Sequence, residues 1–197
     1  MKTLLRTSLM GLAGVMTLGA LTGIPAEAGT CANNTACNTT VTFDVTAGSL
    51  EITVPNSTVD LTTDAAPGGY ASGQLGAVTV NDARGSATPT WSTAVTSTAF
   101  TTGGGDDPGE TISNASVSYC SGTATATTGN GTFTPGQTGC AAPPPATGQA
   151  LNASRTAYSH SGGTGSNSAT WNPLITIAVA LSNVAGQYSA TITHTVT

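Results

Sequence analysis

Charged and aromatic side chains are scarce in this chain: 7% of its 197 residues are charged and 5% are aromatic. Lysine and arginine together number only four. So few cations cannot neutralise a phosphate backbone, which argues against nucleic acid as a partner. The net charge of −5 would also repel an anionic membrane or a polyanionic wall polymer unless a bound cation screened it.

The start of the chain has the pattern of a secretory signal peptide, assigned to residues 1–28. Lys2 and Arg6 make it positive, an uncharged apolar run follows, and Ala26-Glu27-Ala28 is a small-x-small cleavage site. The apolar run is too short and wrongly flanked for a membrane span. We expect cleavage to leave residues 29–197 outside the cytoplasm, without lysine or methionine and with a formal charge of −6.

No second apolar run reaches transmembrane length, so we expect no membrane insertion. The chain shows no sorting signal and no terminal anchor. We therefore expect a secreted protein that is released, or held at the cell surface by non-covalent contacts. Its oligomeric state stays open.

What the sequence does contain is threonine, serine, glycine and alanine, with β-branched residues supplying much of the apolar content. Apolar and polar residues alternate in seven stretches, at 41–45, 50–54, 75–80, 91–95, 112–119, 175–181 and 188–197. This period of two is typical of half-buried strands. Turns rich in glycine and proline separate the stretches.

These features predict an all-β fold, an immunoglobulin-like antiparallel β-sandwich of about eight or nine strands. We assign residues 29–197 to a single domain, because neither side of Pro143-Pro144-Pro145 offers enough strands for a sandwich of its own. Residues 121–149 form a long excursion rich in glycine, proline and threonine.

Four cysteines, an even number in an exported chain, predict two disulfides. Three pairings are possible. Pairing of Cys31 with Cys37 and of Cys120 with Cys140 is favoured because each intervening segment is rich in turn residues. Zinc is disfavoured, because the cysteines lack zinc-knuckle spacing and no histidine lies near either pair.

The sequence offers little catalytic chemistry. His194 shares a strand face with Tyr188 and Ile192, which favours a structural role inside the fold. His160 lies in a Gly/Ser-rich stretch that we expect to be a loop. No G-x-S-x-G nucleophile elbow is present. We predict that the protein is not an enzyme and needs no cofactor.

The acidic residues Asp106, Asp107 and Glu110 cluster in a glycine-rich loop. Such oxygen ligands suit calcium, but the spacing lacks the pattern of an EF-hand loop, and a solvated loop is the commoner outcome. Acids packed into one loop also cannot straddle a glycosidic bond. We expect no metal site.

Asp82 and Arg84 follow a predicted strand. Because arginine is so scarce, a carboxylate two residues away suggests a charge-assisted contact that fixes this corner of the fold. A structural role is favoured over ligand binding.

Three aromatic residues are candidates for stacking on sugar rings, namely Trp91, Trp171 and Tyr188. Trp91 alternates with Thr93 and Val95, so core packing is favoured for it over a surface platform. Trp171 precedes Asn172-Pro173 at the expected start of a strand. Its ring would suit the end of a sandwich.

An ordered set of short motifs resembles the WxL-type surface domains of Gram-positive bacteria. The motifs run from Leu50-Glu51-Ile52-Thr53-Val54-Pro55 through Val78 to Gly85, Trp91, Phe100 and Trp171-Asn172-Pro173 to the stretch from Ala185 to Thr197. The resemblance implies an exported, non-enzymatic, all-β protein that attaches non-covalently to the cell wall. It covers roughly residues 41–197. Where the family has Trp-x-Leu, this chain has Trp91-Ser92-Thr93 and His194-Thr195-Val196.

Two hypotheses follow. The leading one is a non-catalytic secreted protein that associates non-covalently with peptidoglycan or a wall glycan. The alternative is a structural or adhesive subunit that assembles with itself or with other surface proteins, because exposed strand edges on a surface of low charge favour edge pairing.

Overall fold

The computed structural model describes residues 29–141 and 147–197. The predicted signal peptide and Pro143-Pro144-Pro145 lie outside this range. The chain divides into two compact units, one reaching Phe43 and the other spanning Asp44–Thr197. Of the residues predicted to form a single domain, 29–43 belong to the first unit and 44–197 to the second.

The described part of the first unit is exposed throughout and is closed by one disulfide. Cys31 bonds to Cys37, as predicted from the turn-rich segment between them. Asn34 has a φ of 63°, and Thr35 donates its backbone N–H to the carbonyl of Ala32 at 3.0 Å. Asparagine tolerates this left-handed turn conformation better than most residues, which lets the short loop close.

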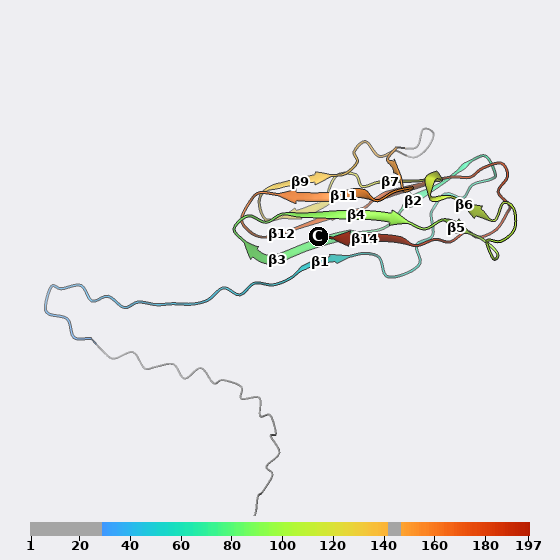
Figure 1. The fold of residues 1–197 in the computed structure, drawn as a ribbon. Helices are drawn as coiled ribbons and strands as arrows, with labels where there is room; N and C mark the ends of the chain where they lie inside the picture. The colour runs from blue at the N-terminus through green and yellow to red at the C-terminus, as the bar shows by residue number, and fades with distance from the viewer. Residues whose placement is uncertain (1–28, 142–146) are drawn as a thin grey trace, which may run out of the picture. The chain divides into compact units, whose positions relative to one another are not determined.

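The second unit is all-β. Its elements are β1 Leu50–Thr53, β2 Tyr70–Gln74, β3 Val78–Ser86, β4 Trp91–Ser97, β5 Phe100–Thr101, β6 Thr111–Ile112, the 3-10 turn η1 Asn114–Ser116, β7 Val117–Cys120, β8 Ala126–Thr128, β9 Thr132–Pro135, β10 Gln149–Ala150, β11 Arg155–Ser161, β12 Gly165–Trp171, β13 Leu174–Ala178 and β14 Ile192–Val196. Every pairing among them is antiparallel. The predicted all-β antiparallel sandwich is confirmed (Figure 1).

One layer of the sandwich consists of two four-stranded sheets joined end to end. Their strand orders are β1-β3-β12-β8 and β10-β7-β13-β2. β3 pairs with β12 in the first sheet, and β2 pairs with β13 in the second. The short connections β2–β3 and β12–β13 lie side by side where the two sheets meet. There Leu75 donates its N–H to Pro173 O, and Gly76 donates to Asn172 Oδ1, each at 2.9 Å. Proline has no N–H for the ladder, so the strand is interrupted at Pro173.

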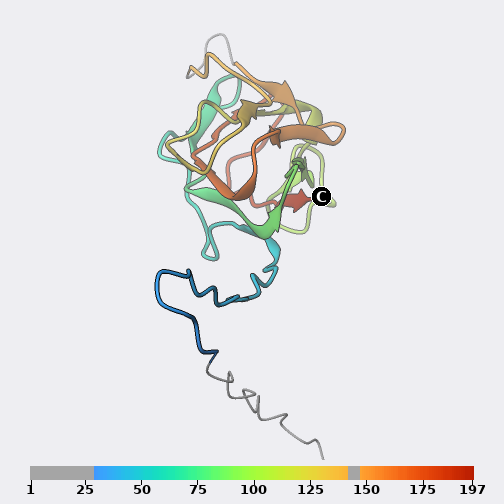
Figure 2. The ribbon, with the colours of Figure 1, turned by 90° about the vertical axis from the view of Figure 1, so that its left-hand side faces the viewer.

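The other layer is the sheet β14-β4-β11-β9, continued by the small sheet β5-β6. A single bridge between Thr101 and Ser189 links the two. Seen along the strands, the sheets surround a common interior (Figure 2). Breaks of this kind contribute to the fourteen short strands found in residues 29–141 and 147–197, where the alternation predicted eight or nine.

The core is built from the inward positions of both layers. Alternation places Val78 and Val80 of β3, and Trp91 and Val95 of β4, in the interior at 3% exposure or less. The other members of this buried cluster are Ile112, Val117, Tyr119, Leu151, Ala157, Tyr158, Ala169, Trp171, Ile175 and Ile177.

Three predicted strand boundaries are wrong. Residues 41–45 form no strand, and Val41, Phe43 and Val45 are 82–84% exposed. The run from Ile175 ends at Ala178, and Leu181 is fully outside the core. In each case the alternation is present, but no second layer lies opposite to bury it. The third boundary concerns the last run, in which only Ile192–Val196 forms a strand.

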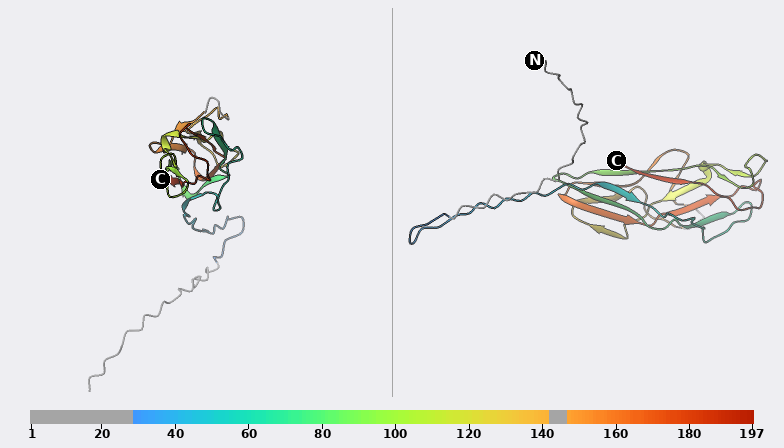
Figure 3. Two further views of the ribbon diagram at one scale, coloured as in Figure 1. Left: turned by 90° about the vertical axis from the view of Figure 1, so that its right-hand side faces the viewer. Right: turned by 90° about the horizontal axis from the view of Figure 1, so that it is seen from below.

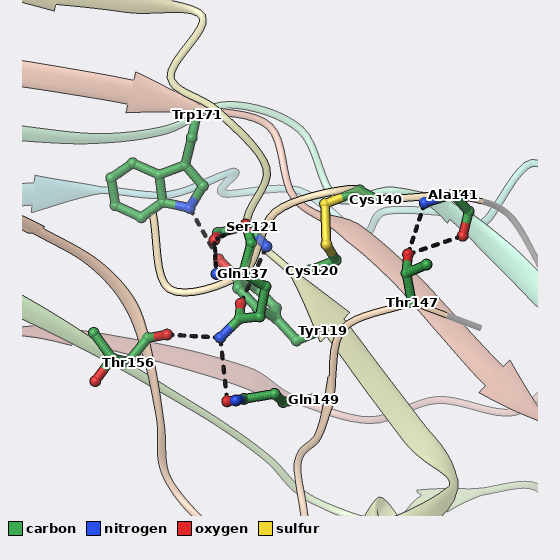
Figure 4. The surroundings of a disulfide bond; sticks show 10 residues. All are labelled: Tyr119, Cys120, Ser121, Gln137, Cys140, Ala141, Thr147, Gln149, Thr156 and Trp171. Atoms are coloured by element: carbon green, nitrogen blue, oxygen red, sulfur yellow. Dashed lines mark hydrogen bonds between the residues drawn. A yellow bond between two sulfur atoms is a disulfide. The ribbon is translucent and has the colours of Figure 1, made fainter. Parts of the chain in front are cut away.

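The second disulfide, Cys120–Cys140, confirms the other predicted pairing (Figure 4). It closes a segment that is more ordered than the predicted excursion at residues 121–149, because this segment contributes β8 to one layer and β9 to the other. The buried Gln137 holds the loop to the sandwich. Its amide donates to Thr156 O at 2.9 Å, and its Oε1 accepts from the N–H of Ser121 at 3.2 Å.

Candidate functional site

A cleft opens between two irregular stretches of the second unit. Residues 54–67 form one wall and residues 184–194 form the other. It consists of two adjoining hollows of about 660 and 620 Å³. Both are lined by Val59, Asp60, Leu61, Phe100, Gln187 and Tyr188, so they form one continuous feature, called here the β14 cleft.

The β14 cleft has both polar and apolar lining, and its apolar side chains are called here its floor. Leu75, Phe100 and Ile175 lie beneath one hollow, and Ile112 and Ile177 beneath the other. Phe100 and Leu75 are only partly buried by the core against which they pack. Apolar side chains that keep accessible surface in a concave place are typical of a site that binds a partner.

The strand β14 lies at the end of its sheet, with β4 on one side and no strand hydrogen-bonded to its other side within residues 29–141 and 147–197. It runs to the C-terminus, marked C in Figure 3. Ser189, Thr191 and Thr197 bond towards β4 and its continuation. Because backbone groups alternate sides along a strand, those of Ala190, Ile192 and His194 point away from β4, to an open edge where β1 lies near β14 but is not hydrogen-bonded to it. An edge of this kind is a template for a further strand.

Tyr188 is the one predicted stacking residue that lies in the cleft. Its hydroxyl donates to Gly109 O at 2.7 Å and lies 2.9 Å from Val184 O. These contacts anchor the ring at the wall beside Gln187. Tyr188 thereby joins the cleft wall to the turn that precedes β6.

Trp91 and Trp171 do not fit the interpretation as surface platforms. Trp91 is 3% exposed, and Trp171 is fully buried. The Trp171 ring stacks on Tyr158 with centroids 4.9 Å apart. The favoured alternative, core packing, is what the structure shows for Trp91, and neither indole offers a face to a sugar ring. Trp171 ends β12 rather than starting a strand.

A hydrogen-bonded chain connects the core to β14. Trp171 Nε1 donates to Tyr119 Oη at 2.9 Å, and Tyr119 Oη lies 3.0 Å from His194 Nε2. Burial lowers the pKa of His194 to about 4, and burial raises the pKa of Tyr119. At neutral pH the imidazole is therefore uncharged and shares a hydrogen bond with the Tyr119 hydroxyl. These contacts are those expected of the structural role predicted for His194.

A second hydrogen-bond network surrounds Asp82 and Arg84, the pair predicted to fix a corner of the fold. Arg84 binds Asp82 through two hydrogen bonds, Nε to Oδ1 at 2.8 Å and Nη2 to Oδ2 at 2.9 Å. Asn167 donates to Asp82 at 3.4 Å and accepts from Trp91 Nε1 at 2.7 Å. The Arg84 hydrogen bonds hold the pKa of the fully buried Asp82 below its usual value.

The predicted contact between Asp82 and Arg84 is present, but their predicted placement after a strand is wrong. Both lie inside β3. The strand continues because Gly85 adopts a φ of 64°, beside a register shift in the pairing of β3 with β12. Such a bulge turns the strand without ending it.

The predicted loop position of His160 is also wrong. His160 lies on β11 and is 3% exposed. Its ring stacks on Trp91 at 5.8 Å, and its Nε2 lies 3.0 Å from Asn130 O. Burial of a histidine just before a glycine-rich turn has no signature in the local sequence, because its partners come from β4 and the turn at Asn130.

The acidic loop that contains Asp106, Asp107 and Glu110 is stabilised by hydrogen bonds to the Glu110 carboxylate. Glu110 Oε2 accepts the N–H groups of Gly105 at 3.0 Å and Asp107 at 3.4 Å. Within residues 29–141 and 147–197, no three histidine, cysteine or acidic side chains gather as metal ligands would. Among the same residues, no helix has the length and apolarity needed to cross a membrane.

The cleft itself was not predicted from the sequence. Val59, Asp60 and Leu61 precede a glycine-rich turn, and their weak alternation suggested neither a strand nor a site. Phe100 and Ile175 come from opposite layers. Only the tertiary structure brings the residues that line the cleft together, because they come from distant parts of the sequence.

Comparisons with known proteins identify no relative. No family model matches the chain, no curated protein matches it, and no solved structure matches it. The functional argument therefore depends on the residues of the fold and of the cleft.

Proposed function

We propose that the mature protein is a non-catalytic structural subunit of the cell surface, which assembles non-covalently with other copies of itself. The observation that carries this proposal is the open edge of β14 beside an apolar cleft. An unpaired edge and unfilled apolar surface together favour the addition of a strand from a partner. The absence of lysine from residues 29–197 excludes lysine-based isopeptide cross-links in such an assembly.

Export is part of the proposal. The signal-peptide pattern supports it, and so do the disulfides Cys31–Cys37 and Cys120–Cys140, which persist in oxidising compartments.

The positions of the two histidines support a non-catalytic role. His160 is buried between Trp91 and Phe133, and His194 is engaged with Tyr119. Each imidazole is occupied by a partner that orders the fold, whereas a general base needs access to a substrate proton.

Wall association, the leading hypothesis from the sequence, remains as a second candidate. Tyr188 favours it, because this residue lies in the cleft next to the polar side chains of Asp60 and Gln187. Burial of Trp91 and Trp171 removes the other two stacking candidates. Self-assembly is therefore favoured over wall association.

The test compares the two candidates on one preparation of oxidised residues 29–197. Sedimentation velocity over a range of protein concentrations measures self-association, and co-sedimentation with isolated cell-wall sacculi measures wall binding. Reversible association that grows with concentration supports assembly. A monomer at every concentration that binds sacculi saturably would overturn assembly and favour the wall polymer.

A further inference from the structure

We infer that residues 39–45 of one copy bind as an added strand in the β14 cleft of a second copy, with Val41, Phe43 and Val45 entering the cleft. This inference deepens the proposed function and rests on it. Residues 39–45 are called here the donor segment.

The donor segment has the chemistry of a strand without a sheet. Val41, Phe43 and Val45 alternate with Thr42 and Asp44, so an extended chain presents one apolar and one polar face. The three apolar side chains are 82–84% exposed. Three large apolar residues on one face, all accessible, are unusual unless a partner covers them.

The β14 cleft supplies the complementary surface. The apolar residues of its floor that keep accessible surface include Leu75 and Phe100, and Ile192 of β14 lines the same hollow. Ala190, Ile192 and His194 direct backbone groups to the open edge, where the N–H and C=O groups of an added strand would pair. Backbone pairing would hold the segment, and its apolar face would meet the floor.

The lengths agree. Seven residues in extended conformation span about 23 Å at 3.3 Å per residue. The wall from Tyr188 to His194 also has seven residues and lines one hollow for most of its length. The polar face with Thr42 and Asp44 would remain towards solvent, so no charge is buried.

The donor segment is expected to occupy the β14 cleft of a second copy rather than the cleft of its own chain. Gly48 donates to Ala83 O at 2.8 Å, and Ala83 donates to Ser49 O at 2.8 Å. The chain is therefore already extended and paired three residues after Val45, which leaves no turn there for a return path. One donor segment and one cleft per copy make a head-to-tail contact, which builds open chains or rings.

The test uses oxidised residues 29–197 and two variants with matched controls. Phe43→Asp places a charge on the apolar face of the donor segment, whereas Thr42→Asp places the same charge on its polar face. Ala190→Glu lengthens a side chain that lines the cleft, whereas Thr195→Glu makes the corresponding change on the exposed outer face of β14. Thermal unfolding checks that all four variants fold.

Association is expected to weaken on the order of 100-fold in Phe43→Asp, which removes the burial of a large apolar side chain. A similar loss is expected in Ala190→Glu, which places a longer, charged side chain in the cleft and keeps the apolar face of the donor segment out. Thr42→Asp and Thr195→Glu are expected to associate within a few-fold of the parent protein. An equal mixture of Phe43→Asp and Ala190→Glu is expected to recover dimers but no longer chains. In such a dimer, the intact donor segment of the Ala190→Glu copy binds the intact cleft of the Phe43→Asp copy.

A photo-cross-linking residue in place of Phe43 locates the contact. In a mixture of isotopically light and heavy copies, cross-links from position 43 are expected to join light to heavy chains at residues of the cleft. Cross-links confined to one copy would overturn the inference, because the segment would then fill its own cleft.

Failure of the inference is distinguishable from failure of the proposed function. If the parent protein associates and Phe43→Asp associates equally, the inference is wrong while assembly stands. If the parent protein never associates, both are wrong. If Ala190→Glu loses binding to sacculi while Phe43→Asp retains it, the cleft belongs to a wall polymer, which also overturns the inference.

Discussion

The stability of the fold is expected to fall between pH 6.5 and pH 4 because of one side chain, His194. Its imidazole is uncharged in the folded protein at neutral pH, where burial lowers its pKa to about 4 from the ordinary value of 6.5. In the unfolded chain it takes up a proton near pH 6.5. Acid therefore favours unfolding, and the full stability is present only above the unfolded value.

The magnitude follows from the size of this shift. A difference of one pKa unit corresponds to about 1.4 kcal/mol, so the change from 6.5 to about 4 amounts to about 3 kcal/mol. Asp82 does not contribute to the change in stability between pH 6.5 and pH 4. Its pKa lies below the ordinary value of 3.8, so its stabilising effect is lost only at lower pH. A loss of about 3 kcal/mol is large beside the 5–15 kcal/mol that is typical of a domain.

The assay is urea unfolding at a series of pH values between 6.5 and 4, monitored by tryptophan fluorescence. His194→Gln is the matched variant, because an amide oxygen can accept the Tyr119 hydroxyl but does not titrate. The variant is expected to lose most of the pH dependence in this window. Equal slopes in the variant and the parent protein would refute the reasoning and assign the acid sensitivity elsewhere.

Three further outcomes are expected, each measured by urea unfolding. Arg84→Met should cost about 3 kcal/mol because it leaves the buried Asp82 carboxylate without its cation, and adding Asp82→Asn should restore part of the loss. Replacing Cys120 and Cys140 together with alanine should cost about 3 kcal/mol, the loop entropy for a separation of 20 residues, and no loss would contradict this estimate. Trp171→Phe should cost about 2 kcal/mol through the lost hydrogen bond and lost volume, and an unchanged midpoint would show that the core repacks freely.

Much of the fold was predictable from local pattern. Alternation at Val78 and Val80, and at Trp91 and Val95, identified inward positions correctly, because a strand must place alternate side chains on one face. Both disulfides followed from short turn-rich segments between the cysteines. The contact between Asp82 and Arg84 was also predictable, since it joins residues two apart.

What the local pattern could not decide was which alternating segments acquire a partner layer. The run at residues 41–45 alternates as well as β3 does, yet its apolar face is exposed and that of β3 is buried. Burial of His160 and Trp171 likewise depends on residues far away in the chain, such as Asn130 and Tyr119.

The cleft has the same origin. Its walls come from residues 54–67 and 184–194, and its floor from strands of both layers, so no single stretch of sequence encodes it. The sequence by itself determined where the apolar faces and covalent links lie. The tertiary structure alone decided which faces are covered, because burial depends on the pairing of distant strands, and it left both the β14 edge and the donor segment uncovered.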